Sequence, residues 1–112
     1  MTGGKGDSNG GGPTIPDAGE ECKPTYPGAR LASPRNLSII QVGELLRLES
    51  RQVNGSPVLF AVTRAGVEIG AVTVRDAGQI LRCIDRGYQY GAEVTRMDGA
   101  DVTLKINRIG TP

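Results

Sequence analysis

The fold is decided by residues 67–94, which read VEIGAVTVRDAGQILRCIDRGYQYGAEV. A short apolar run is followed by TVRD at 73–76, a variant of the helix capping box with Asp in place of Glu. We therefore expect a helix from about residue 74 to residue 86, with Gly87 as the left-handed residue that follows it. Apolar side chains at helical spacing predict one buried stripe, which consists of Ala77, Ile80, Leu81 and Ile84.

Three strands are expected before this helix. Residues 45–53 alternate between apolar and polar side chains, a pattern typical of a half-buried strand. Asn54-Gly55 then favours a tight hairpin, because both central positions of a type I′ turn need positive φ. Residues 58–64 are the return strand, and residues 67–71 are a third strand. The first strand separates Leu46 and Leu48 from Arg47, Glu49 and Arg51, and the return strand has Val58, Phe60 and Val62 on one side.

Two further strands are expected after the helix. They cover residues 88–97 and 101–109, and Asp98-Gly99 between them favours a second primed turn. Their apolar faces are Tyr88, Tyr90, Ala92 and Val94 on the first, and Val102, Leu104 and Ile106 on the second. The order β-β-β-α-β-β predicts an α+β, mostly β fold. We expect a small, partly open β-barrel, because closure protects the edges of short strands.

Composition divides the chain into three parts. Residues 1–21 are rich in Gly, Asp, Ser and Pro with almost nothing apolar to bury, which predicts a disordered tail. Residues 22–36 contain three prolines and are expected to be an extended arm lying on the domain. The folded domain is expected over residues 37–112. Residues 37–40 would begin it as a short strand or as a turn of helix.

The charge balance is nearly neutral. Thirteen basic and twelve acidic residues give a net charge of +1, which weakens any reading that relies on general attraction to a nucleic-acid backbone. No apolar run reaches the roughly 18 residues of a membrane span. The first residues also lack the hydrophobic core of a secretory signal. We therefore expect a cytoplasmic protein with no membrane partner.

The chain has two cysteines, Cys22 and Cys83, and no His. In a cytoplasmic protein both are expected to be free thiols. The alternative is a disulfide that ties the N-terminal arm to the helix. Two distant cysteines without His do not make an ordinary zinc site, so no metal and no cofactor is expected. Without His, acid–base chemistry would fall to isolated carboxylates, and no catalytic constellation stands out.

The order of elements and several local segments resemble the HIRAN domain. The matching segments are 58–62, GVEIG at 66–70, 77–84 and YQYGAEV at 88–94, and the resemblance covers roughly residues 44–109. The Asn/Asp-rich segment that the family carries before its second strand is absent. The resemblance implies a small barrel of the kind found in helicase-associated and replication-fork proteins and in standalone bacterial or phage proteins. Some members of the family bind single-stranded DNA ends, and the resemblance implies this ligand here only where the binding residues match.

A positive and aromatic surface is the candidate nucleic-acid site. Arg75 begins the predicted helix, whose N-terminal N–H groups can hold an anion. Bases can stack on tyrosine beside arginine, although both tyrosines would instead pack in the core if their strand face is buried. The candidate binding residues are Arg47, Arg51, Arg75, Arg82, Arg86, Tyr88 and Tyr90.

Two functions follow from these features, and neither is enzymatic. The first is a binding module of HIRAN type with single-stranded nucleic acid as its ligand. The second is a protein-interaction or adaptor role, in which a partner or a second copy of the chain adds a strand to an exposed edge. Such a protein would suit a phage, a mobile element or a defence system.

Overall fold

The computed structural model describes residues 22–112, and the tail predicted for residues 1–21 lies outside them. The elements are β3 (Thr25–Ala32), η1 (Leu37–Ile39), β4 (Leu45–Val53), β5 (Ser56–Val62), β6 (Glu68–Thr73), α3 (Ala77–Asp85), β7 (Gln89–Asp98) and β8 (Asp101–Gly110). Of the two alternatives for residues 37–40, the helical turn is confirmed by the 3-10 helix η1. The described residues include no helix of the length and hydropathy required to cross a membrane.

The six strands form a closed barrel in the order β3-β6-β5-β4-β7-β8, and all neighbours are antiparallel. The mostly β, α+β architecture is confirmed, but the barrel is closed rather than partly open. Closure depends on β3, which pairs with β6 on one side and with β8 on the other. This strand lies within the segment 22–36, the predicted arm. Its residues Tyr26, Ala29 and Leu31 are buried in the core.

The hairpin of β4 and β5 forms as predicted. Val53 and Ser56 are paired on either side of Asn54-Gly55, whose φ values are 52° and 83°. Positive φ at both loop positions matches the requirement of a type I′ turn. Core-facing residues of the two strands are Leu46, Leu48, Leu59 and Ala61. The side shared by Val58 and Phe60 is therefore the outer face of the hairpin. Val62, predicted on the same side, is fully buried, and a register shift in the pairing with β6 separates it from Ala61.

The helix α3 begins at Ala77, later than predicted. Thr73 cannot cap it, because β6 continues through Thr73, which pairs with Arg30 of β3. Asp76 precedes the helix and makes no side-chain cap hydrogen bond. Gly87 has φ 102° and is confirmed as the left-handed residue after the helix. The fully buried residues of α3 are Ile80 and Cys83, whereas Ala77, Leu81 and Ile84 are half-buried.

The last hairpin is shifted by one residue from the predicted turn. Asp98 pairs with Asp101, so the loop is Gly99-Ala100 rather than Asp98-Gly99. Gly99 supplies the positive φ, at 60°, in the first loop position. The inward alternation predicted for β8 is confirmed, because Val102, Leu104 and Ile106 are fully buried.

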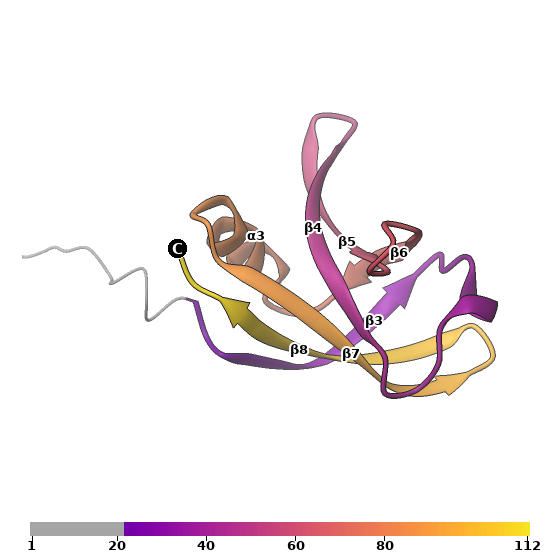
Figure 1. The fold of residues 1–112 in the computed structure, drawn as a ribbon. Helices are drawn as coiled ribbons and strands as arrows, with labels where there is room; N and C mark the ends of the chain where they lie inside the picture. Colours follow the sequence, from indigo (N-terminus) through magenta and orange to yellow (C-terminus); the bar gives the residue numbers. More distant parts are fainter. Residues whose placement is uncertain (1–21) are drawn as a thin grey trace, which may run out of the picture.

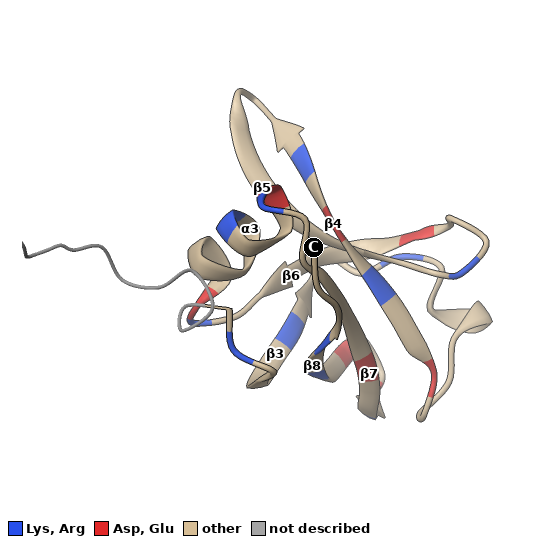
Figure 2. Ribbon diagram, turned by 60° about the vertical axis from the view of Figure 1, so that its left-hand side comes forward, with Lys and Arg blue, Asp and Glu red and all other residues tan. Residues whose placement is uncertain are grey.

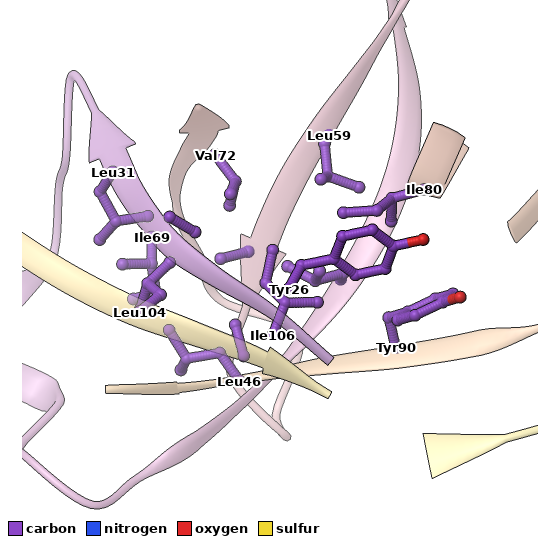
Figure 3. Packing of buried hydrophobic residues seen from close by; sticks show 14 of the residues in the cluster. Tyr26, Leu31, Leu46, Leu59, Ile69, Val72, Ile80, Tyr90, Leu104 and Ile106 are labelled. Atoms are coloured by element: carbon purple, nitrogen blue, oxygen red, sulfur yellow. The ribbon is translucent and has the colours of Figure 1, made fainter. Parts of the chain in front are cut away.

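Aliphatic side chains from all six strands fill the barrel, and two tyrosines close one end of it (Figure 3). Tyr26 of β3 and Tyr90 of β7 are 2% and 1% exposed, and their tilted rings lie 6.0 Å apart between centroids. Edge-tilted pairs of this kind are favourable beyond the area that they bury. Ile80 of α3 packs onto this end of the core.

Cys22 and Cys83 form a disulfide, with Cα atoms 5.7 Å apart. The expectation of free thiols is wrong, and the alternative, a bond between the N-terminal segment and the helix, is confirmed. Both residues are fully buried. The pairing depends on the strand β3, whose position in the barrel brings the start of the described chain against α3.

Candidate binding groove along strand β4

Strand β4 leaves the barrel partway along its length. It pairs with β5 from Arg47 to Val53, but with β7 only from Leu45 to Arg47. Figure 1 shows the β4–β5 hairpin extending beyond the rest of the barrel, with α3 beside its base. Among residues 22–112, no strand covers the β7-side edge of β4 beyond Arg47.

This open edge presents the backbone of Leu48, Ser50 and Gln52. The pair that flanks a two-residue hairpin loop exchanges both hydrogen bonds, and bonded pairs then alternate along the ladder. Because Val53 and Ser56 flank the loop, the odd-numbered residues of β4 bond to β5 and the even-numbered ones point away. In the described part of the chain, no backbone hydrogen bond reaches those three residues from the open side.

The other edge of the hairpin is different. β5 pairs with β6 only from Phe60 to Val62, so the outer part of β5 is also uncovered within residues 22–112. There, however, Pro57 lies opposite Gln52 and has no N–H to offer. A proline at an edge position blocks strand addition at no cost to the existing ladder. The hairpin therefore has one edge interrupted by proline and one open edge.

A hollow of about 370 Å³, which we call the notch, lies where β4 diverges from β7. Its floor contains Leu48 of β4, Ile84 of α3 and Tyr90 of β7, and its rim contains Arg47 and Tyr88. The other lining residues are Gly87, Gln89 and Ile109. Leu48, which lines the notch, is also the first residue of the unpaired edge of β4.

Two more hollows are lined in part by residues of β4. The first, which we call the cleft, measures about 380 Å³ and lies between the hairpin and α3, lined by Ser50, Gln52, Pro57, Gly78, Leu81, Arg82 and Asp85. The second, the Arg64 hollow, measures about 200 Å³ and is lined by Leu45, Leu46, Arg47, Arg64 and Ile109. We call the three hollows together the groove; their lining residues on β4 extend from Leu45 to Gln52, roughly 25 Å at the rise of a strand.

The outer face of β4 carries a network of ion pairs. Glu49 accepts hydrogen bonds from Arg47, at 2.8 Å from Nη2, and from Arg51, at 2.9 Å from Nη2. Arg51 also reaches Glu68 of β6 at 3.1 Å and lies over the ring of Phe60. Hydrogen bonds from Arg47 and then Arg51 hold the pKa of Glu49 below its ordinary value of 4.5. The two arginines are thus matched by two carboxylates.

The two tyrosines of the candidate site have separate roles. Tyr90 is in the core, and its hydroxyl donates to the carbonyl of Lys23 at 3.2 Å. Burial raises the pKa of Tyr90 to about 12, so it is neutral at physiological pH. Tyr88 is half-buried at the rim of the notch, with the Arg108 guanidinium 5.9 Å from its ring centroid. Only Tyr88 is placed where a ligand can touch its ring.

The structure does not bring all seven predicted residues together. Arg47, Arg82 and Tyr88 line the groove, and Tyr90 contributes only to its floor. Arg75, in the turn before α3, and Arg86, after it, line none of the three hollows, and neither does Arg51. Figure 2 shows basic and acidic positions interspersed over several elements rather than collected on one face.

The groove also contains residues that sequence reasoning missed, namely Leu48, Ser50, Gln52, Ile84 and Arg64. One signal was present: Pro57 marks one side of a hairpin as an edge. Within residues 22–112, no group of three or more His, Cys, Asp or Glu side chains is placed to hold a metal ion. Comparison of the chain with known families, with characterised proteins and with solved structures found no match.

Proposed function

We propose that this chain is a non-enzymatic binding module that accepts an extended segment of a partner protein as an added strand on β4. The observation that carries the proposal is the unpaired edge at Leu48, Ser50 and Gln52. Each of these residues offers an N–H and a C=O in the plane of the sheet, spaced as a peptide backbone would pair with them. Strand addition of this kind is a recurring mode of peptide recognition.

The surroundings of the edge support a peptide. The edge is bordered by hollows of about 380 and 370 Å³, sizes typical of ligand sites, so side chains of an added strand have space beside it. On the neighbouring outer face, Glu49 and Glu68 match Arg47 and Arg51, which leaves little excess positive charge to attract a polyanion. A neutral peptide backbone does not depend on such an excess.

The proposal is tested with a library of random octapeptides displayed on phage and selected on the purified chain. Selected peptides are then measured by fluorescence anisotropy on the wild type and on Ser50→Pro. The variant removes the Ser50 N–H, which points outward from the open edge. Pro57 lacks the equivalent N–H on the other strand of the hairpin. We expect at least about tenfold weaker binding, through a lost hydrogen bond and a steric block.

Ser50→Thr is the matched control, because it keeps the backbone N–H and suits a strand. It should bind the same peptides as the wild type does. The unfolding free energy of both variants, measured in urea, checks that the fold is intact. Peptides that bind Ser50→Pro as well as the wild type, or a selection that enriches nothing, would rule out strand addition to β4.

Single-stranded nucleic acid is the second candidate ligand. It is favoured by Arg47, Arg82 and Tyr88, which line the same groove, and by the resemblance of the element order to the HIRAN domain. Stacking on Tyr88 beside arginine would be the mode of contact. The groove offers such a ligand the ring of Tyr88 and three arginines, Arg47, Arg64 and Arg82, so weak and strongly salt-dependent binding is expected.

A fluorescein-labelled single-stranded oligonucleotide at low salt tests this candidate. Binding that is lost in an Arg82→Ala, Tyr88→Ala double variant would support it. No binding at tens of micromolar protein would remove nucleic acid from consideration. Arg75→Ala, outside the groove, is the control.

The Cys22–Cys83 disulfide bears on the compartment in which the protein folds. The cytoplasmic location predicted from the sequence stays a prediction, and the Cys22–Cys83 disulfide counts against it, because disulfides persist mainly in oxidising compartments. Rapid acid quenching of cells followed by alkylation with a maleimide of known mass would decide. Two added labels without reduction indicate a reducing compartment, and labels added only after reduction indicate an oxidising one.

A further inference from the structure

We infer that the strand added to β4 is β4 of a second copy of this chain, in antiparallel pairing about a two-fold axis at Ser50. The pairing rests on the proposed strand addition and names its partner. Three properties of the hairpin support it: the extent of its open edge, the charges on the outer face of β4, and the proline on its other edge.

The open edge is short and has Ser50 at its centre. It begins at Leu48, because β7 occupies this side of β4 as far as Arg47. It ends at Gln52, the last residue before the pair that flanks the turn. In a two-fold interface, residue i of one copy meets residue j of the other, and j meets i. Ser50 then lies opposite Ser50 of the second copy, and Leu48 lies opposite its Gln52.

This register pairs every outward-pointing backbone group of the edge. The N–H and C=O groups of Leu48, Ser50 and Gln52 point away from β5. Each of these residues meets another of the three in the second copy. Directly opposed residues whose backbone groups point toward one another exchange both of their hydrogen bonds. Three residue pairs, with two hydrogen bonds each, therefore join the two hairpins.

The structure has space where the second hairpin meets the barrel. The last pair between β4 and β7 is Arg47 with Gly91, so the next would be Leu48 with Tyr90. Leu48 and Tyr90 instead line the notch, a hollow of about 370 Å³. The residues that follow Gln52 in the second copy enter this hollow. Pairing begins only at Leu48, so β7 keeps its place on β4.

The outer face of β4 is self-complementary in charge. In this register Glu49 lies opposite Arg51 of the second copy, and Arg51 lies opposite its Glu49. These are the non-hydrogen-bonded pairs, whose side chains are closest. An axis at residue 51 would oppose two arginines, and an axis at residue 49 would oppose two glutamates. Like charges directly opposite destabilise a sheet, so the charges favour the register centred on Ser50.

The other edge of the hairpin limits the assembly to two copies. A hairpin with two open edges can add further copies on both sides. Here the second edge contains Pro57, which has no N–H to offer. The net charge of +1 adds little repulsion between two copies. We therefore expect a closed dimer, which is weak because so short a paired edge buries little surface.

Two opposite charge reversals test the pairing. Glu49→Arg opposes two arginines in its own dimer, and Arg51→Glu opposes two glutamates, whereas a mixture of the two variants restores opposite charges at both pairs. Sedimentation velocity of the wild type from about 10 μM to about 1 mM chain should show a monomer–dimer equilibrium. Each variant alone should dimerise at least about tenfold more weakly. The equimolar mixture should recover the wild-type strength as a heterodimer.

Glu93→Arg is the matched control, because it makes the same change of charge on β7, where β4 and β8 already pair on both sides. It should dimerise as the wild type does. The unfolding free energy of each variant, measured in urea, checks the fold. A wild type that stays monomeric to about 1 mM, a dimer that both reversals leave unchanged, or a mixture that does not recover would overturn the inference.

The peptide experiment separates failure of this inference from failure of the proposed function. If self-pairing fails but selected peptides bind and Ser50→Pro weakens them, β4 accepts a strand of a different protein, and only the second copy is wrong. If Ser50→Pro changes neither the dimer nor the binding of peptides, strand addition itself fails. Recovery in the mixture together with loss of the dimer in Ser50→Pro supports both.

Discussion

The two sides of helix α3 contrast. On one side, Cys83 and Gln79 hold the segment Cys22–Tyr26, which we call the junction. On the other side, Gly78, Leu81 and Asp85 form a wall of the cleft beside the open edge of β4. The junction is cross-linked and hydrogen-bonded, and its residues Cys22 and Tyr26 are buried. The groove instead keeps backbone groups of a strand unpaired within residues 22–112.

The junction contains a chain of polar contacts behind the disulfide. Tyr26 donates to Gln79 at 2.9 Å, Tyr90 donates to the Lys23 carbonyl, and Arg108 donates to the carbonyl of Cys22. Buried polar groups must be satisfied in this way, or they destabilise the fold. Under the proposed function, the difference between the regions places stability and binding on opposite sides of one helix. Substitutions at the junction should therefore change the unfolding free energy more than peptide affinity, and substitutions in the groove should do the reverse.

Removing the disulfide should have the largest effect. Cys22 and Cys83 are 61 positions apart, so the cross-link constrains most of the described chain in the unfolded state. The Cys22→Ala, Cys83→Ala double variant should lose about 4 kcal/mol of unfolding free energy, measured by urea denaturation. Reductant should lower the stability of the wild type and leave that of the variant unchanged. Equal stability of the two proteins would show that the junction does not depend on the bond.

Removing one hydroxyl from the junction should have an intermediate effect. Tyr90→Phe leaves the Lys23 carbonyl without its donor and should cost about 1 kcal/mol. Tyr88→Phe, at the notch, is the control and should cost less. In both cases peptide affinity should change less than stability does.

Tyr90 should also lower the unfolding free energy at alkaline pH. The pKa of Tyr90 is about 12 in the fold, against 10 in the unfolded chain, because burial disfavours the phenolate. The contribution of Tyr90 is therefore complete below pH 10 and is lost as the pH rises toward 12. Unfolding free energies measured across this range should fall less steeply in Tyr90→Phe than in the wild type. Identical slopes would contradict the assignment.

The smallest effect is expected on the outer face of β4. The folded-state pKa of Glu49 is below 4.5, so its contribution is present above that pH and is lost as the pH falls through the folded value. Glu49→Gln should cost less than about 1 kcal/mol near neutrality, because the ion pairs are partly exposed. It should also make the unfolding free energy fall less steeply as the pH is lowered from about 5 to about 3. Glu93→Gln, on the neighbouring strand, is the control and should keep the pH dependence of the wild type.

Local patterns predicted most of the elements because their causes are local. Asn54-Gly55 specifies its turn through φ, and the alternation of Val102, Leu104 and Ile106 specifies which face of β8 is buried. Helix α3 was predicted as an element, but its start was wrong. Thr73 has the side chain of a cap, yet strand pairing with β3 takes that residue into the sheet. Hydrogen bonds between strands that are distant in the sequence therefore outweighed the local cap signal at Thr73.

The candidate site was harder to predict than the elements. Arg47, Arg82 and Tyr88 were identified from residue type, and the structure places them along one groove. Tyr90 belongs to the same strand face as Ala92 and Val94 and is buried with them. Arg75 and Arg86 are near these residues in sequence but line none of the hollows.

By itself, the sequence of residues 67–94 determined a helix that stops at Gly87 and a strand that follows it, because these depend on side chains within a few residues of one another. Only the tertiary structure decided that residues 25–32 close the barrel, that Cys22 meets Cys83, and that β4 separates from β7 after Arg47. These are contacts between residues far apart in the chain. They depend on how many strands a closed barrel needs and where each one ends, which no local pattern encodes.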